Sequence, residues 1–150
     1  MIVKKVNLRL SLASIDYLPF ARELTRVNMR AYYAQYGLIW QPAAFDAEWP
    51  SRESYLIHRE SCLIGFLGIT VEKNYLYVRD IQLIEAYRGE GAGSWAMTRI
   101  AHMAAERRCE RIRLKVFKSN PATALYRRLG YARVGEETAL LWMERLVDGR

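Results

Sequence analysis

Apolar and polar residues alternate along seven short stretches of the chain, which is the pattern of strands that bury one face. The predicted strands are residues 6–10, 55–58, 63–71, 75–84, 111–117, 131–134 and 139–145. Along three other stretches, apolar residues recur every three or four positions, which predicts helices with one buried face. The predicted helices are residues 17–37, 92–107 and 120–130.

The order of these elements indicates how the strands pair. Apart from the helix at 17–37, short turns join the first four strands, so we expect an antiparallel meander. A helix separates strand 75–84 from strand 111–117, which favours a parallel pair with a right-handed crossover. The expected fold class is α/β (α+β), with a mixed and mostly antiparallel sheet. A length of 150 residues suits one domain spanning residues 1–150.

Composition narrows the class of protein. A hydrophobic content of 51% with 26% charged residues is ordinary for a globular protein. The net charge of +7 fits an anionic partner, but does not choose among nucleic acid, a membrane surface and a polyphosphate cofactor. The two cysteines lie in no metal-binding spacing, so we expect no metal and a cytoplasmic protein with reduced thiols. No apolar run approaches the roughly 20 residues of a membrane helix, and Arg9 and Asp16 interrupt any signal-peptide core, so no membrane partner is expected.

The stretch at residues 75–97 carries the first functional motif and reads YLYVRDIQLIEAYRGEGAGSWAM. A strand runs into a turn that contains Gly89, Gly91 and Gly93, and this turn opens a helix. Glycines allow a ligand to approach the backbone, and the free N–H groups of a helix N-terminus attract anions. The turn is therefore predicted to hold a pyrophosphate. A P-loop is excluded because no lysine follows Gly93, whereas residues 91–96 do fit the dinucleotide pattern G-x-G-x-x-G/A.

A second motif separates these alternatives. Residues 88–93 (RGEGAG) resemble the acyl-coenzyme A loop Q/R-x-x-G-x-G/A of the GNAT superfamily of N-acetyltransferases. Residues 120–131 (NPATALYRRLGY) resemble the second motif of that superfamily, an Asn, then a Tyr on a helix, then Gly-Tyr. The resemblance covers nearly the whole chain. It implies the GNAT fold, with about six or seven strands and about four helices. It also implies transfer of acetyl from acetyl-CoA to a primary amine by direct attack in a ternary complex.

The resemblance further implies which residues bind coenzyme A. The pantetheine arm would pair with the strand backbone, the pyrophosphate would bind the turn, and Asn120 would bind pantetheine or cap the helix that follows it. The cofactor-binding residues so implied are Ile81, Gln82, Leu83, Arg88, Gly89, Glu90, Gly91, Ala92, Gly93, Ser94, Asn120 and Tyr126.

The chemistry of acetyl transfer asks for three further groups. A lysine-like amine, with a pKa of about 10.4, must lose a proton to a base before it attacks. The tetrahedral oxyanion needs a donor, for which the backbone N–H of Leu83 is the candidate, and Tyr126 can protonate the departing thiolate. Some members of the superfamily carry a Glu base where this chain has Tyr77. Asp80 is the preferred carboxylate, and Glu72 or a chain of waters stays open.

Aromatic residues crowd the end of the first predicted helix and the segment that follows it. Tyr32, Tyr33, Tyr36 and Trp40 either pack over the edge of the core or line the pocket of the acceptor, and both roles stay open. The acceptor would be a small-molecule or peptide amine. Exposed aromatic side chains would also be compatible with a homodimer.

Three other functions stay open on the sequence. A binding module of the same fold could sense acyl-CoA without turnover, because Tyr77 replaces the familiar base. A basic nucleic-acid-binding protein would explain the charge, but the chain has no docking motif, so no nucleic acid is expected as a partner. A nicotinamide-dependent enzyme would explain the dinucleotide pattern.

Overall fold

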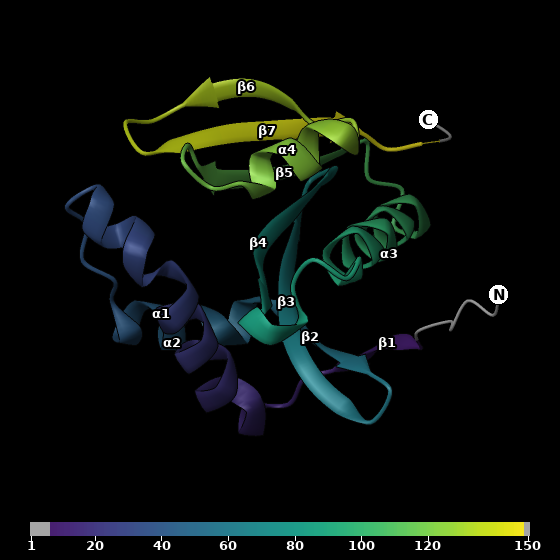
Figure 1. Ribbon diagram of the computed structural model, residues 1–150. Helices are drawn as coiled ribbons and strands as arrows, with labels where there is room; N and C mark the ends of the chain where they lie inside the picture. The colour runs from purple at the N-terminus through teal and green to yellow at the C-terminus, as the bar shows by residue number, and fades with distance from the viewer. Residues whose placement is uncertain (1–6, 149–150) are drawn as a thin grey trace, which may run out of the picture.

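The computed structural model describes residues 7–148, which form one seven-stranded sheet in the order β1-β2-β3-β4-β5-β7-β6 (Figure 1). The strands are β1 (Leu8–Leu12), β2 (Glu53–Arg59), β3 (Cys62–Glu72), β4 (Tyr75–Leu83), β5 (Arg111–Phe117), β6 (Ala132–Glu136) and β7 (Leu140–Leu146). Strands β4 and β5 are parallel, and the other neighbours pair antiparallel. The mixed sheet, the meander and the parallel pair are therefore confirmed. The predicted start of the first strand, at residue 6, lies outside the described residues.

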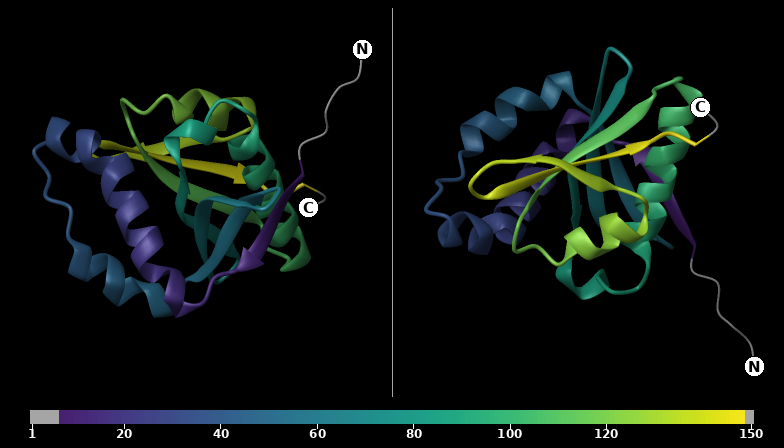
Figure 2. Two further views of the ribbon diagram at one scale, coloured as in Figure 1. Left: turned by 60° about the horizontal axis from the view of Figure 1, so that its bottom comes forward. Right: turned by 90° about the horizontal axis from the view of Figure 1, so that it is seen from above.

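Four α-helices flank the sheet: α1 (Leu18–Gln35), α2 (Pro42–Glu48), α3 (Ala92–Glu106) and α4 (Ala122–Arg128). Helices α1 and α2 lie on one side of the sheet and α3 on the other (Figure 2). Single 3-10 turns precede α1, follow α2 and connect β4 to the glycine turn, at Ile15–Tyr17, Trp49–Ser51 and Glu85–Tyr87. Three of the four helices match the sequence pattern. Helix α2 was not predicted, because Pro42 suggests a break, whereas here it occupies the first helical position, where proline is favoured.

The core has two parts. The larger one packs β3, β4, β5 and β7 against α3 and α4, and the smaller one packs α1 and α2 against β2 and β3. Phe45 and Trp49 belong to the smaller part, where Phe45 meets Phe66 edge-on with ring centroids 6.3 Å apart. For these two aromatic residues, packing over the core is therefore the observed role.

Strands β4 and β5 diverge halfway along their length. Their parallel register joins Tyr75–Val78 to 111–114 and ends there, although β4 continues to Leu83 and β5 to Phe117. At the same point the register between β3 and β4 shifts, so that Arg79 is an extra residue on β4. Such a bulge bends and twists the strand that carries it. The second half of β4 consequently has an edge without a strand beside it, and this opening holds the candidate site.

Candidate active site

Two cavities meet at the divergence of β4 and β5. The first, of about 670 Å³, is lined by the glycine turn and the start of α4, and we call it the turn cavity. The second, of about 430 Å³, is lined by aromatic side chains from α1, α2 and β5, and we call it the aromatic cavity. Five residues line both cavities and form their common wall: Met29, Ile81, Gln82, Asn120 and Tyr126. Residues that are far apart in the sequence, on α1, on β4 and at α4, therefore lie side by side where the cavities join.

The glycine turn has the backbone that the sequence predicts for an anion site. Gly89 and Gly91 have φ angles of 77° and 87°, which are unfavourable for residues with a Cβ. Gly91 precedes α3 and no side chain caps the helix, which leaves the first amides of α3 for a ligand. Gly89, Gly91, Gly93 and Ser94 all line the turn cavity.

The other residues predicted at this turn differ in where their side chains lie. Arg88 lines the turn cavity, and its Nη2 donates to the carbonyl of Leu83 at 3.3 Å. The side chain of Glu90 is instead paired with Arg59 at 2.8 Å, and Ala92 is buried in the core. For Glu90 and Ala92, only the backbone remains as the predicted contact with a pyrophosphate.

The open edge of β4 presents backbone groups to the cavities. The N–H of Ile84 donates to Ile64 of β3 at 2.8 Å. Because successive residues of a strand point their backbone groups to opposite neighbours, the N–H groups of Leu83 and Ile81 point away from β3, into the opening. Ile81, Gln82 and Leu83 line the turn cavity. This is the arrangement that the pairing of an extended ligand with β4 requires.

Asn28 of α1 holds this edge, and sequence reasoning missed it. Its Nδ2 donates both to the carbonyl of Leu83 at 3.0 Å and to Oε1 of Gln82 at 3.1 Å. Asn28 follows Leu24 by four residues, so it is a polar residue on the apolar face of a predicted helix, a signal that could have identified it.

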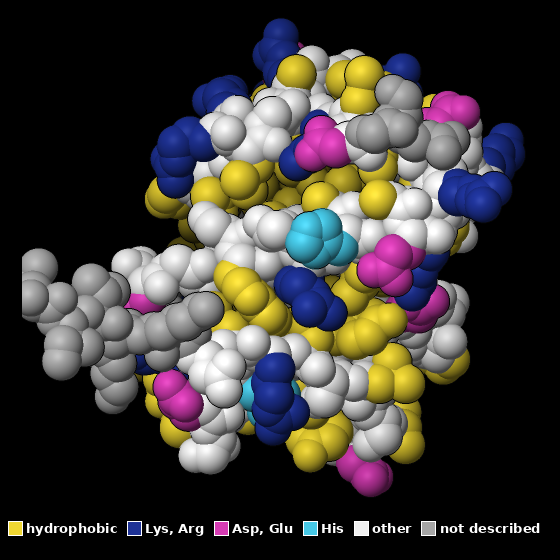
Figure 3. Space-filling model, turned by 90° about the vertical axis from the view of Figure 1, so that its right-hand side faces the viewer, with side chains coloured by type: hydrophobic (Ala, Val, Ile, Leu, Met, Phe, Trp, Pro, Cys, Tyr) yellow, Lys and Arg dark blue, Asp and Glu magenta, His cyan; other side chains and the backbone are white. Residues whose placement is uncertain are grey.

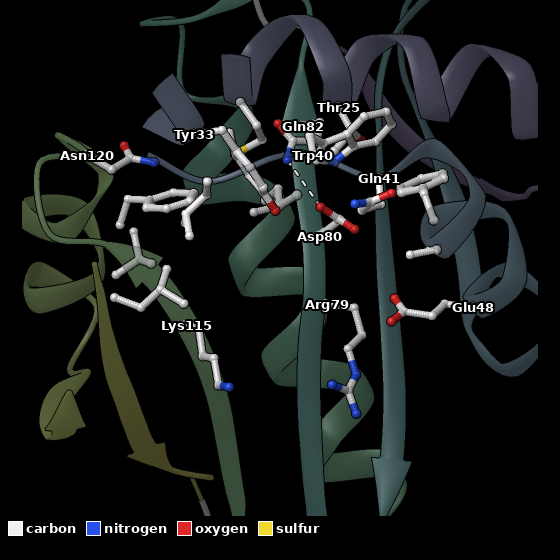
Figure 4. Close-up of a pocket in the computed structure, with 18 of the residues that line it drawn as sticks. Thr25, Tyr33, Trp40, Gln41, Glu48, Arg79, Asp80, Gln82, Lys115 and Asn120 are labelled. Atoms are coloured by element: carbon white, nitrogen blue, oxygen red, sulfur yellow. Dashed lines mark hydrogen bonds between the residues drawn. The ribbon is translucent and has the colours of Figure 1, made fainter. Parts of the chain in front are cut away.

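Asp80 lies in a chain of hydrogen bonds between residues that line the aromatic cavity. Its Oδ1 accepts from Nε2 of Gln82 at 3.2 Å (Figure 4), and its Oδ2 accepts from Arg52. Arg52 also pairs with Glu48 of α2 at 2.6 Å. The side chain of Asp80 is only 13% exposed. This burial raises the pKa of Asp80 above its ordinary value, while the Arg52 guanidinium opposes the rise.

The alternative carboxylate lies elsewhere. Glu72 is 64% exposed, pairs with Arg79 at 2.8 Å and lines neither cavity. Glu48, which sequence reasoning did not consider, does line the aromatic cavity. Asp80 directly precedes Ile81 and Gln82 of the common wall in the sequence, whereas Glu48 lies on α2.

Tyr126 and Asn120 reach the common wall from the second motif. Tyr126 is 7% exposed, and burial raises the pKa of its hydroxyl to about 12, so the hydroxyl is protonated at neutral pH. Its ring packs edge-on against Tyr131, with centroids 5.9 Å apart. Asn120 accepts a hydrogen bond from the backbone N–H of Ala122 at 2.9 Å, so it caps the start of α4 as well as lining both cavities.

The four aromatic residues predicted to contact the acceptor lie in three different places: the aromatic cavity, the turn cavity and outside both. Tyr33 and Trp40 line the aromatic cavity, whereas Tyr32 lines the turn cavity. Tyr36 lines neither cavity and stacks on Phe117 with centroids 5.7 Å apart. Phe117, the last residue of β5, thus joins part of this segment to the sheet.

Other classes of site are not evident in the part of the chain that the structure describes. Within residues 7–148, no three His, Cys, Asp or Glu side chains are grouped to hold a metal ion. No described helix combines the length and apolar character needed to cross a membrane. On the side of the molecule seen in Figure 3, the Lys and Arg side chains are scattered among acidic, apolar and uncharged ones.

Comparison with known proteins agrees with these motifs and this geometry. The chain is 34% identical over 76 residues to thialysine N-epsilon-acetyltransferase of Sus scrofa, which covers 47% of the chain and 45% of that protein. It is 32% identical over 93 residues to streptothricin acetyltransferase of Streptomyces lavendulae, which covers 60% of the chain and 49% of that protein. The matched regions thus span about half the length of these curated relatives.

A solved structure shares the whole fold. The PaiA N-acetyltransferase of Thermoplasma acidophilum, in complex with coenzyme A, matches 93% of the chain and 99% of its own with a TM-score of 0.74, at 16% identity. Residues 21–131 match the sequence model of the acetyltransferase (GNAT) family, and these residues include both motifs and the common wall of the cavities. The chain therefore belongs to the acetyltransferase (GNAT) family.

Proposed function

We propose that the protein transfers an acetyl group from acetyl-CoA to a primary amine by direct attack in a ternary complex. The observation that carries this proposal is the meeting of two cavities at Ile81, Gln82 and Tyr126. One cavity has a helix N-terminus without a side-chain cap, which suits an anion, and the other has carboxylates and aromatic rings. A direct transfer needs this arrangement, because both substrates must be bound at once with their reacting atoms in contact.

Acetyl-CoA would occupy the turn cavity. The amides between Gly89 and Ser94 would bind the pyrophosphate, with Arg88 beside them, and the pantetheine arm would pair with the open edge of β4. The PaiA structure supports this choice of ligand, since it has the same fold and contains coenzyme A. Residues 81–83 would then bring the thioester to the common wall.

The acceptor amine would enter from the aromatic cavity. We propose Asp80 as the base that takes its proton, because Asp80 adjoins the common wall and burial raises its pKa, which strengthens the carboxylate as a proton acceptor. The neutral nitrogen then forms a bond to the thioester carbon. The carbonyl electrons move to the oxygen, where the N–H of Leu83 would stabilise the negative charge.

Collapse of this intermediate breaks the carbon–sulfur bond and releases a thiolate. Tyr126 would donate its hydroxyl proton to that sulfur, for which a phenol with a pKa of about 12 is in the protonated form. The nitrogen, which is positively charged after the attack, would lose its second proton to solvent, and the proton held by Asp80 would return through solvent to restore Tyr126. The cycle leaves an N-acetyl amine and free coenzyme A, with both residues in their starting states.

Calorimetry with acetyl-CoA, followed by a thiol-release assay with a panel of amines, tests the proposal. The panel should include thialysine and streptothricin, for which the two relatives are named. We expect binding of acetyl-CoA and release of thiol that depends on both the protein and an amine. Binding without release on any amine would favour a sensor. Absence of acetyl-CoA binding would reject the coenzyme assignment.

A further inference from the structure

Two cations line the end of the aromatic cavity where β4 and β5 diverge. Val78 and Leu114 are the last residues joined in the parallel register, and Arg79 and Lys115 follow them on the two strands. Both line the aromatic cavity. In Figure 4 their side chains extend from the two strands toward the same end of the cavity, away from Gln82 and Asn120.

Their present partners are acids at the rim. Arg79 donates to Glu72 at 2.8 Å and to Oγ1 of Thr70 at 2.9 Å, and Lys115 pairs with Glu137 at 3.1 Å. Glu72 and Glu137 are 64% and 47% exposed. Exposed ion pairs of this kind contribute little to stability, so a ligand can replace them at little cost.

Aromatic rings hold the two cationic groups in position. The guanidinium of Arg79 lies 4.0 Å from the ring centroid of Tyr77, and Nζ of Lys115 lies 4.6 Å from that of Trp142. Such contacts favour a fixed location for a long side chain. Arg79 has five N–H donors in a planar fork that matches a carboxylate, so donors remain beyond its two bonds to the rim.

The charges that line the cavity favour a monoanionic ligand. Three cations and two carboxylates line it, and Arg52 is already paired with both carboxylates, Glu48 and Asp80. Arg79 and Lys115 are therefore the cations that lack an acidic partner within the lining. An acceptor whose amine is neutral at the moment of attack, and which carries one carboxylate, would complement this charge.

Resting on the proposed function, we propose that Arg79 and Lys115 form a carboxylate-binding subsite for the acceptor, so that the substrate is an amino acid with its reacting amine distant from its carboxylate. The reacting end, at residues 81–83, lies two to four residues beyond Arg79 on β4. At about 3.3 Å per residue, this corresponds to roughly 7–13 Å along the strand. This separation is measured between backbone positions. Even its lower end exceeds the distance between the α-amine and the carboxylate of a free amino acid, whereas a side-chain or ω-amine reaches it.

A matched pair of amines tests the subsite: 6-aminohexanoate and 1-aminohexane differ in whether a carboxylate or a methyl group ends the chain. Their affinities are measured by calorimetry on the full chain, alone and with coenzyme A, so the measurement does not depend on turnover. We expect the wild type to bind 6-aminohexanoate about tenfold more tightly, since a charge-assisted hydrogen bond contributes about 1.5 kcal/mol or more. Arg79→Gln and Lys115→Gln should each reduce this preference about three- to tenfold and leave the affinity for 1-aminohexane unchanged.

Arg133→Gln is the control, because Arg133 is a 58% exposed cation on β6 that pairs with Glu136 and lines neither cavity. It should keep the full preference for 6-aminohexanoate. Equal affinities for the two amines in the wild type would overturn the subsite, as would an undiminished preference in both Gln variants. Acetyl-CoA binding and thiol release, measured on the same preparations, report separately on the proposed function, so the two failures are distinguishable.

Discussion

Replacement of Gly65 by Ala should displace the neighbouring strand β4. Gly65 of β3 pairs with Leu83 of β4. A Cβ on Gly65 would lie 2.2 Å from the carbonyl oxygen of Gln82 and 3.0 Å from Cδ2 of Leu83. Because non-bonded atoms are most stable at about 3.5–4.0 Å, the two strands would have to separate by about 1 Å or more. The displaced segment is the edge of β4 that we propose for the thioester.

The size of the effect follows from this overlap. Inserting a carbon into a filled space costs about 1–3 kcal/mol, which for a chain of this length lowers the melting temperature by roughly 2–12 °C. A displacement of about 1 Å at a reacting group can also lower the rate about 100-fold. Gly68→Ala is the matched control on the same strand, since its Cβ would meet Cδ of Arg52 at an ordinary 3.6 Å.

Thermal unfolding followed by circular dichroism, with kcat from thiol release, measures both consequences. We expect Gly65→Ala to melt lower and turn over more slowly than Gly68→Ala, which should resemble the wild type. If Gly65→Ala melted within 1 °C of the wild type and kept its kcat, the close approach of β3 to β4 could not be what requires glycine.

Four other substitutions test separate parts of the site. Gly91→Val should abolish acetyl-CoA binding, measured by calorimetry, because its side chain would enter the turn cavity. The fold should persist, since the Cβ would meet no other atom within 4 Å, but the φ of 87° should lower the stability; unchanged affinity would falsify the pyrophosphate assignment. Tyr126→Phe should lower kcat at least tenfold and change acetyl-CoA affinity little, and normal turnover in the variant would remove Tyr126 as the acid. Because a proton donor acts below its pKa, which is about 12 for Tyr126, the activity of the wild type should not fall through this group between pH 7 and 10. Asp80→Asn should lower kcat about 100-fold or more and remove the acid limb of the pH–rate profile, because a base is lost as pH falls through its raised pKa; an unchanged limb would exclude it. Asn28→Ala should cost about 1 kcal/mol in chemical denaturation yet reduce kcat clearly, and loss of stability alone would limit Asn28 to a packing role.

The sequence predicted what depends on local spacing. Alternation located all seven strands, and the glycine turn and the stretch at 120–131 located the two motifs. Prediction from the sequence failed where one local signal is compatible with two structures. Pro42 breaks a helix from within but starts one at its first position, so α2 was missed.

Contacts between distant segments could not be predicted in the same way. Asn28 reaches Gln82 across 54 positions and Arg52 reaches Asp80 across 28, and no repeating pattern links such pairs. Likewise, Tyr33 lies in the last turn of α1 and Tyr36 directly follows the helix, yet only Tyr33 lines the aromatic cavity. Spacing along the chain predicts which face of α1 is buried, but it does not encode which strand that face meets.

The polar chain from Asn28 through Gln82 and Asp80 to Arg52 has a thermodynamic consequence. It begins at the turn cavity and ends at the aromatic cavity, so a ligand that reorients Gln82 on one side alters the partners available on the other. Occupancy of the two cavities is then linked by a coupling free energy, which must be the same in both directions. Whatever factor coenzyme A applies to the affinity for an amine, that amine applies to the affinity for coenzyme A, and substitution of Gln82 should bring that factor toward one.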